Sequence, residues 1–400
     1  MTATATATGH ACVVGYGSVG RLHAEVLTRM GLRVSVLDPR PAQPPGPAVT
    51  WWRAIGQVPD VRDIDVWVVC TPTHTHLPVV ARVLAQDAAA RIVVEKPACR
   101  AGETTALLDL LATLPAARVV VMNQYREAAV LSAMARLVAR EAPGEPIRAL
   151  RVAFTKDRRP DVARGRFVDR DHGVFGYEWL HMLAALGHFL PAPVYDAYLR
   201  GPVAPGSLRT AYDPALALAA AHERATVRGV AVELFSTVAG EGVEAALPRP
   251  GWTRDYPTAT GERQRLVRVE TASARFTAEL EPLGGPELEP VRRDVHRITV
   301  RTSAGDRRLE VADPLIKNAW AGLLAALSAV DCPPPDLRAL HRIASLVGAA
   351  RSADPARSAD PARSADQARG GADLVGHPPA GSRPARAPAG SVFMPRQESA

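Results

Sequence analysis

The 400-residue chain lacks the features that mark secreted, membrane-spanning and zinc-ribbon proteins. It has four cysteines and no CxxC pair, which argues against a disulfide framework or a zinc ribbon and favours a reducing compartment. No apolar run approaches the length of about 18 residues that a membrane span needs, so none is predicted. The N-terminus has no basic residues before its first apolar run, so we expect no secretory signal and a cytoplasmic protein.

Lysine is the scarcest of the charged residues. Of 48 basic residues, only Lys96, Lys156 and Lys317 are lysines. This bias indicates drift from lysine to arginine wherever only a positive charge is needed. Arginine stays protonated, whereas a lysine ammonium is compact and its pKa shifts when the group is partly desolvated. Each remaining lysine is therefore a candidate for a role that arginine does not fill.

The positive net charge does not have the pattern of a nucleic-acid-binding protein. The chain carries +7 at pH 7, with a sequence pI of about 9.6. The two signs are well mixed along the first 350 residues, and no basic block with interleaved aromatic residues is present. The sequence therefore predicts no nucleic-acid partner.

Patterning divides the chain into three parts. Residues 1–125 alternate short apolar strands with helical periodicity, which predicts an α/β Rossmann domain with a parallel sheet, interrupted by a proline-rich irregular crossover at 39–47. Residues 126–350 predict an α+β domain with a mostly antiparallel sheet, including strand-like residues 194–201. Residues 351–400 begin with a six-residue repeat and are poor in large apolar residues, so we expect a disordered low-complexity tail.

A glycine-rich turn follows the first predicted strand. Residues 15–20 read GYGSVG and match G-x-G-x-x-G, where glycines allow a tight turn and close approach of a pyrophosphate. Asp38 ends the next strand, at the position where a carboxylate accepts hydrogen bonds from ribose hydroxyls. This favours NAD, while Arg40 leaves NADP open because its guanidinium is suited to a 2′-phosphate.

Two further motifs follow the third and fourth clear strands of the predicted sheet. Residues 71–76 read TPTHTH and residues 95–97 read EKP, both at the carboxyl edge where open α/β sheets bind ligands. Lys96 at this edge points to a role beside the cofactor. His74 and His76 have no third ligand at a readable spacing, so the sequence predicts no metal site.

These motifs in this order resemble the Gfo/Idh/MocA oxidoreductases, the family of glucose–fructose oxidoreductase, inositol dehydrogenase and rhizopine catabolism proteins. The resemblance covers about residues 9–350 and is carried by GYGSVGRLHA, TPTHTH in place of TPxxxH, EKP, the helix around His181 and the closing PLIKNAWAGLLAAL. It implies an open antiparallel sheet often used for oligomerisation, so a homodimer or homotetramer is expected. It also implies a nicotinamide cofactor. The expected cofactor-binding residues are Gly15, Tyr16, Gly17, Ser18, Val19, Gly20, Asp38, Arg40, Thr71, Pro72, His76, Glu95 and Lys96.

The resemblance also implies catalytic roles. The motif lysine, here Lys96, hydrogen-bonds the reacting oxygen. The acid/base pair of the family is commonly an Asp four residues before a His, and these positions hold Tyr177 and His181, so Tyr177 is itself a candidate proton donor. Helical spacing independently predicts that Tyr177, His181 and His188 share one stripe. A buried structural histidine is an equally good reading of His181, and His188 is read as structural.

The segment before this helix is strongly charged. It contains Lys156, Asp157, Arg158, Arg159 and Arg164. A solvated charged loop is one reading. The other is a binding site for a phosphate or carboxylate on the substrate.

The combined reading is an NAD(P)-dependent oxidoreductase that acts on a small-molecule substrate. Removing a hydride from an alcohol carbon requires a base for the hydroxyl proton and a cation for the developing alkoxide. The substrate class implied is a sugar, polyol or (amino)cyclitol. Two alternatives stay open on the same fold: an NAD-dependent glycosidase and a non-catalytic dinucleotide-sensing regulator.

Overall fold

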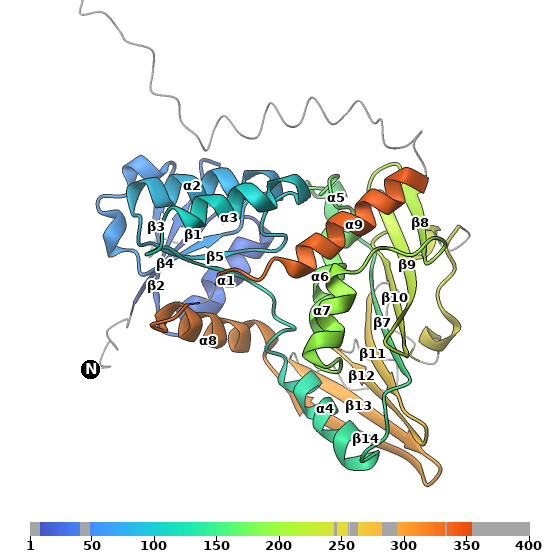
Figure 1. The fold of residues 1–400 in the computed structure, drawn as a ribbon. Helices are drawn as coiled ribbons and strands as arrows, with labels where there is room; N and C mark the ends of the chain where they lie inside the picture. The colour runs from blue at the N-terminus through green and yellow to red at the C-terminus, as the bar shows by residue number, and fades with distance from the viewer. Residues whose placement is uncertain are drawn as a thin grey trace, which may run out of the picture.

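The computed structural model describes residues 9–40, 49–243, 246–254, 256, 263–281, 294–332 and 334–353. Most of the proline-rich crossover predicted at 39–47 and nearly all of the tail predicted at 351–400 lie outside these residues. Figure 1 shows two sheets side by side, the first blue to teal and the second green to orange. No helix among the described residues is long and apolar enough to cross a membrane.

The first sheet is fully parallel, with strand order β3-β2-β1-β4-β5-β6. Its central strands are buried on both faces, as their continuous Val and Ile runs predict. The chain order reverses between β1 and β4, which is where open α/β sheets form a ligand crevice. The elements are β1 (His10–Val14), α1 (Ser18–Arg29), β2 (Arg33–Leu37), β3 (Thr50–Trp52), β4 (Val66–Val69), α2 (His76–Gln86), β5 (Arg91–Val94), α3 (Thr104–Ala112) and β6 (Arg118–Val121).

The second sheet has eight strands in the order β14-β13-β12-β11-β7-β10-β9-β8. Among its described pairs only β7 and β10 run parallel, so the prediction of a mostly antiparallel sheet is confirmed. Its elements are α4 (Ala129–Glu141), β7 (Ala149–Lys156), α5 (Arg159–Ala163), α6 (Leu180–Leu186), α7 (Ala192–Arg200), β8 (Leu208–Asp213), β9 (Ala217–Val227), β10 (Val230–Thr237), β11 (Arg263–Glu270), β12 (Ala274–Glu279), β13 (Val295–Thr302) and β14 (Gly305–Ala312).

Short turns of other helix types join these elements. A single π-helical turn, Phe175–Trp179, runs directly into α6. The 3₁₀ turns are Ile55–Gln57, Val61–Asp63, Thr73–Thr75, Ala101–Glu103, Gly240–Val243 and Gly251–Thr253.

The prediction of a strand at residues 194–201 is wrong, because α7 occupies this segment. Pro191 is the N-cap, and a second proline lies in the first turn, where its missing N–H costs no hydrogen bond. Val194 and Tyr195 pack on the core beside Tyr198 and Leu199, four residues further on. The aromatic and β-branched residues of this segment are typical of strands, which led to the wrong prediction. Their spacing, however, places them on one face of a helix.

The last two helices connect the two halves. Helix α8 (Leu315–Ser328) packs against the first sheet, where Trp320 is fully buried, although the sequence places it within the second domain. Helix α9 (Arg338–Ala353) packs along α7 and reaches the second sheet (Figure 1). The domain limits 1–125 and 126–350 stay predictions. Helix α8, from far along the chain, covers part of the first sheet.

Candidate active site

The glycine turn at the switch point needs its glycines for steric reasons. Gly15 has φ +90, and a Cβ there would lie 2.9 Å from the backbone nitrogen of Thr71. A Cβ at Gly20 would lie 2.0 Å from the carbonyl oxygen of Gly15. At Gly17, by contrast, a Cβ would meet no atom of another described segment within 4 Å, so the turn is open at that point. This geometry fits a pyrophosphate approaching the start of α1.

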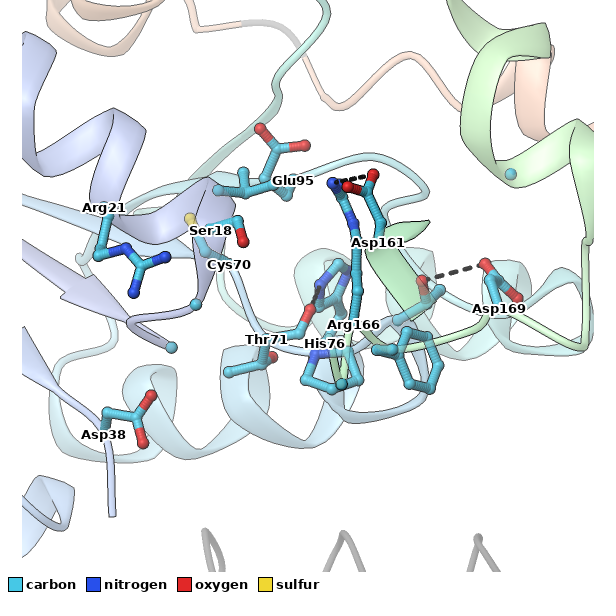
Figure 2. A pocket seen from close by; sticks show the side chains of 18 of the residues that line it. Ser18, Arg21, Asp38, Cys70, Thr71, His76, Glu95, Asp161, Arg166 and Asp169 are labelled. Atoms are coloured by element: carbon cyan, nitrogen blue, oxygen red, sulfur yellow. Dashed lines mark hydrogen bonds and ion pairs between the residues drawn. The ribbon is translucent and has the colours of Figure 1, made fainter. Parts of the chain in front are cut away.

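Asp38 lies at the end of β2, beside the same turn. Its Oδ2 accepts a hydrogen bond from the Tyr16 backbone N–H at 2.7 Å, and its Oδ1 accepts one from the Arg40 N–H at 2.8 Å. Figure 2 shows Asp38 and Arg21 at one end of the cavity. Sequence reasoning missed Arg21, whose only signal was its place one residue after the last glycine of the motif.

The first cavity, as we call the cleft at this turn, has a volume of about 790 Å³. Tyr16 and Gly20 do not line it, and Tyr16 packs its side chain against the core. His181 does not line it either. The predicted residues that do are Gly15, Gly17, Ser18, Val19, Asp38, Arg40, Thr71, Pro72, His76, Glu95, Lys96 and Tyr177.

His76 joins two of the motifs. Its ring nitrogens lie 2.7 Å from the carbonyl oxygen of Thr71 and 2.8 Å from that of Pro97. Burial lowers the pKa of His76, and a neutral ring donates to one of these two carbonyls. The side chain thus fixes the TPTHTH and EKP turns next to each other, which holds the cavity wall in place (Figure 2).

Glu95 is held by a relay that begins on α8. The Trp320 indole N–H donates to His23 Nδ1 at 2.9 Å, so Nε2 carries the ring proton and donates to Glu95 Oε1 at 2.6 Å. Burial opposes ionisation of Glu95, but the hydrogen bond from His23 and its charge interactions leave its pKa lowered. His23 was not predicted as a site residue, because its partner is 297 positions away.

Lys96 is half-buried and lines both this cavity and a second one. Its Nζ donates to the backbone carbonyls of Tyr177 at 2.5 Å and Gly176 at 3.2 Å. Burial lowers the pKa of Lys96 to about 8, against the opposing effect of the nearby Glu178 and Glu95 carboxylates. The ammonium is therefore close to its titration point at neutral to mildly alkaline pH.

The π-turn separates two residues that the sequence analysis placed together. An α-helix has about 3.6 residues per turn and would align Tyr177 with His181, but the i→i+5 turn shifts that register. Tyr177 lines the first cavity, and His181 lines the second. The prediction of one stripe is therefore corrected. His188 lines neither, and its Nε2 lies 2.8 Å from the carbonyl oxygen of Tyr125.

The Tyr177 hydroxyl is engaged by the backbone. It accepts a hydrogen bond from the Asp169 N–H at 2.8 Å and donates to the Phe167 carbonyl at 3.2 Å. Burial raises the pKa of Tyr177. This hydroxyl is poorly placed to supply a proton, because it already donates within the protein.

The second cavity has a volume of about 750 Å³ and contains His181 together with a buried carboxylate, Glu178. Glu178 accepts a hydrogen bond from Arg158 at 2.6 Å, and Arg265 lies 3.4 Å away. Burial opposes ionisation of Glu178, but Arg265 and Arg158 hold its pKa far below the usual range. Burial and the Lys96 charge hold the pKa of His181 well below 6.5, so its ring is neutral. Sequence reasoning missed Glu178.

The comparisons with known proteins agree with this architecture. Residues 10–125 match a family model described as an oxidoreductase family with an NAD-binding Rossmann fold, GFO_IDH_MocA. Residues 10–125 therefore match the NAD-binding domain of the Gfo/Idh/MocA oxidoreductases. The match confirms three predictions: the family, the NAD(P) cofactor and the oxidoreductase class. No match was found among curated protein sequences.

Three solved structures share the fold of both halves of the chain. A 3-ketoreductase from Actinomadura kijaniata, in complex with NADP and TDP-benzene, is 13% identical with a TM-score of 0.59, covering 86% of this chain and 97% of that one. A UDP-N-acetylglucosamine 3-dehydrogenase from Acidithiobacillus ferrooxidans is 18% identical with a TM-score of 0.57, covering 87% and 98%. A Gfo/Idh/MocA oxidoreductase from Vibrio cholerae has a TM-score of 0.56 at 12% identity, covering 88% and 99%.

Proposed function

We propose that this protein interconverts a secondary hydroxyl and a ketone on a sugar, polyol or (amino)cyclitol, with a nicotinamide cofactor in the first cavity and the substrate in the second. One observation carries the proposal. Lys96 lies where the two cavities meet, and it lines both. A group at that junction reaches a cofactor on one side and a substrate on the other.

In this function Lys96 binds the reacting oxygen. Its ammonium now donates to two backbone carbonyls, and the half-buried surroundings strengthen its attraction for a developing alkoxide. The nicotinamide, when bound, supplies hydride acceptance and donation. Glu95, held by His23, lies beside Lys96 and keeps a negative charge next to the ammonium.

His181 is our candidate for the acid/base group. Its ring is neutral and lines the second cavity, so a ring nitrogen is able to accept the hydroxyl proton. Nδ1 lies 3.4 Å from Asn123 Oδ1, and the ring makes an edge contact with Tyr125. Glu178 favours the protonated form of His181 after transfer, because its carboxylate faces the same cavity. Tyr177 is the weaker candidate, since its hydroxyl is bonded to the backbone.

The choice between NAD and NADP depends on the end of the first cavity that holds Asp38, Arg40 and Arg21. The Asp38 carboxylate accepts two backbone hydrogen bonds. The Arg21 side chain lines the same end of the cavity, and a guanidinium suits a 2′-phosphate. We infer that both nucleotides bind and that their affinity ratio depends on Arg21.

The test is a fluorescence titration of the full chain with NADH and with NADPH, followed by a screen of sugars, polyols and amino-sugars. Saturable nucleotide binding and substrate-dependent change in nicotinamide absorbance support the proposal. Absence of binding by either nucleotide overturns it. Release of free sugar with no net change in nicotinamide would support the glycosidase instead.

A further inference from the structure

The second cavity carries an excess of positive charge. It is lined by eight cationic side chains and four carboxylates, whereas the first cavity has five cations and four carboxylates. A recess with low-dielectric walls and one predominant sign of charge concentrates ligands of the opposite sign. A neutral sugar gains nothing from this arrangement, but an anionic derivative does.

All three lysines of the chain line this cavity. Lys96, Lys156 and Lys317 lie on its wall, together with only five of the 45 arginines. They come from the edge of the first sheet, from the end of β7 and from α8, so sequence proximity does not explain their convergence. A chain that uses arginine almost everywhere has kept its compact ammonium groups in this one place.

Several cations at the edge of the cavity share one carboxylate. Asp161 lies at N–O distances between 2.7 and 3.9 Å from Lys156, Arg158 and Arg166 of this cavity and from Arg164 of the first cavity. Arg158 also pairs with Glu178. Figure 2 shows Arg166 extended beside Asp161, at the end of the first cavity away from Asp38. Burial lowers the pKa of Lys156 and of Arg166, and the charge of Arg158 lowers both further. An added anion would relieve this repulsion.

Lys317 lies on a different element from the other two lysines. It is exposed on α8, and no carboxylate lies within ion-pair distance of it among the described residues. It therefore offers a free ammonium at the cavity wall contributed by a different element from Lys156.

We propose that the substrate of the second cavity carries an anionic group, a phosphate or a carboxylate. Lys156, Arg166 and Lys317 hold this group while Lys96 contacts the reacting oxygen. The proposal rests on the function given above for the same site. It decides between the two readings of the charged segment at 156–164, because Lys156 and Arg158 line the cavity.

A calorimetric titration tests the anion site without knowledge of the natural substrate. Inorganic phosphate is titrated into the full chain saturated with nicotinamide nucleotide, which blocks the pyrophosphate position of the first cavity. We expect saturable binding that the double variant K156Q/K317Q weakens about tenfold or more, since two charged contacts are lost. The control is R159Q: Arg159 is close in sequence, pairs with Asp157 and lines neither cavity.

A second arm distinguishes phosphate from carboxylate and protects the test against a folding defect. Glucose 6-phosphate, glucuronate and glucose are each tested as competitors of phosphate. The single variant K317Q is included because the Lys317 side chain is exposed, so its replacement should not disturb folding. Competition by either anionic sugar but not by glucose supports the proposal and names the group. Absence of saturable phosphate binding, or equal binding by R159Q and the double variant, overturns it. If no nicotinamide binds, the proposed function fails, and the titration on nucleotide-free protein still reads the anion site.

Discussion

The two cavities that meet at Lys96 are built in different ways. The first is shaped by backbone: the glycine turn and the carbonyls tied by His76 come from short, contiguous motifs. The second is shaped by charged side chains from β7, β11 and α8, which are far apart in the sequence. The difference suggests a division of labour, because a backbone site suits a cofactor common to many enzymes whereas charged side chains suit one substrate class.

The largest effect is expected at Lys96, which lines both cavities. Lys96→Ala removes the ammonium that binds the reacting oxygen, so turnover should fall about 100- to 1,000-fold. NADH affinity should change only a few-fold, because the glycine turn remains. Stopped-flow or steady-state absorbance gives the first quantity and fluorescence titration the second. Near-normal turnover would show that Lys96 does not bind the reacting oxygen.

The second prediction tests whether the first cavity depends on backbone access. Gly17→Ala places a methyl group in open space, so the melting temperature should be unchanged. NADH affinity should nevertheless fall about tenfold or more, because the pyrophosphate approaches at this point. Gly56→Ala is the matched control, since its Cβ also meets nothing and Gly56 does not line the cavity. Equal NADH affinity in both variants would mean that the dinucleotide lies elsewhere.

These two cavities also show what the sequence was able to predict. The glycine turn, Asp38 and the TPTHTH and EKP turns follow the ends of predicted strands, so local pattern was sufficient to group them. Glu178 was missed because Arg265, one of its two partners, is 87 positions away, and His23 because Trp320 is 297 positions away. Tyr177 and His181 were wrongly aligned because a π-turn leaves no clear sequence signal. The strand predicted at 194–201 failed because composition outweighed periodicity.

The third prediction concerns the pH dependence of turnover, which should differ from that of NADH binding in the first cavity. Burial lowers the pKa of Lys96 to about 8, so kcat/KM should fall about tenfold per pH unit above that value as the ammonium is lost. The pKa of His181 lies well below 6.5, so titration of His181 contributes no loss between pH 6.5 and 8. NADH affinity should be flat across the same window. Lys96→Arg should be less active than the parent chain, and in this variant the alkaline fall should disappear. Its persistence would assign the titration to another group.

The smallest effect is expected at the relay from α8 to the first cavity. Trp320→Phe removes the indole N–H that fixes the His23 tautomer and leaves a buried ring nitrogen without its donor. We expect a loss of about 1–3 kcal/mol in the free energy of unfolding, measured by urea denaturation, and a several-fold loss of turnover through Glu95.

Trp179→Phe is the control for that substitution. Trp179 is equally buried, but its indole nitrogen has no hydrogen-bond partner among the described residues, so the change removes an unsatisfied donor along with similar packing. It should therefore cost less stability than Trp320→Phe. If the two variants lose the same stability and the same turnover, the effect at Trp320 is packing alone. The wall of the first cavity would then not depend on the tautomer that α8 imposes on His23.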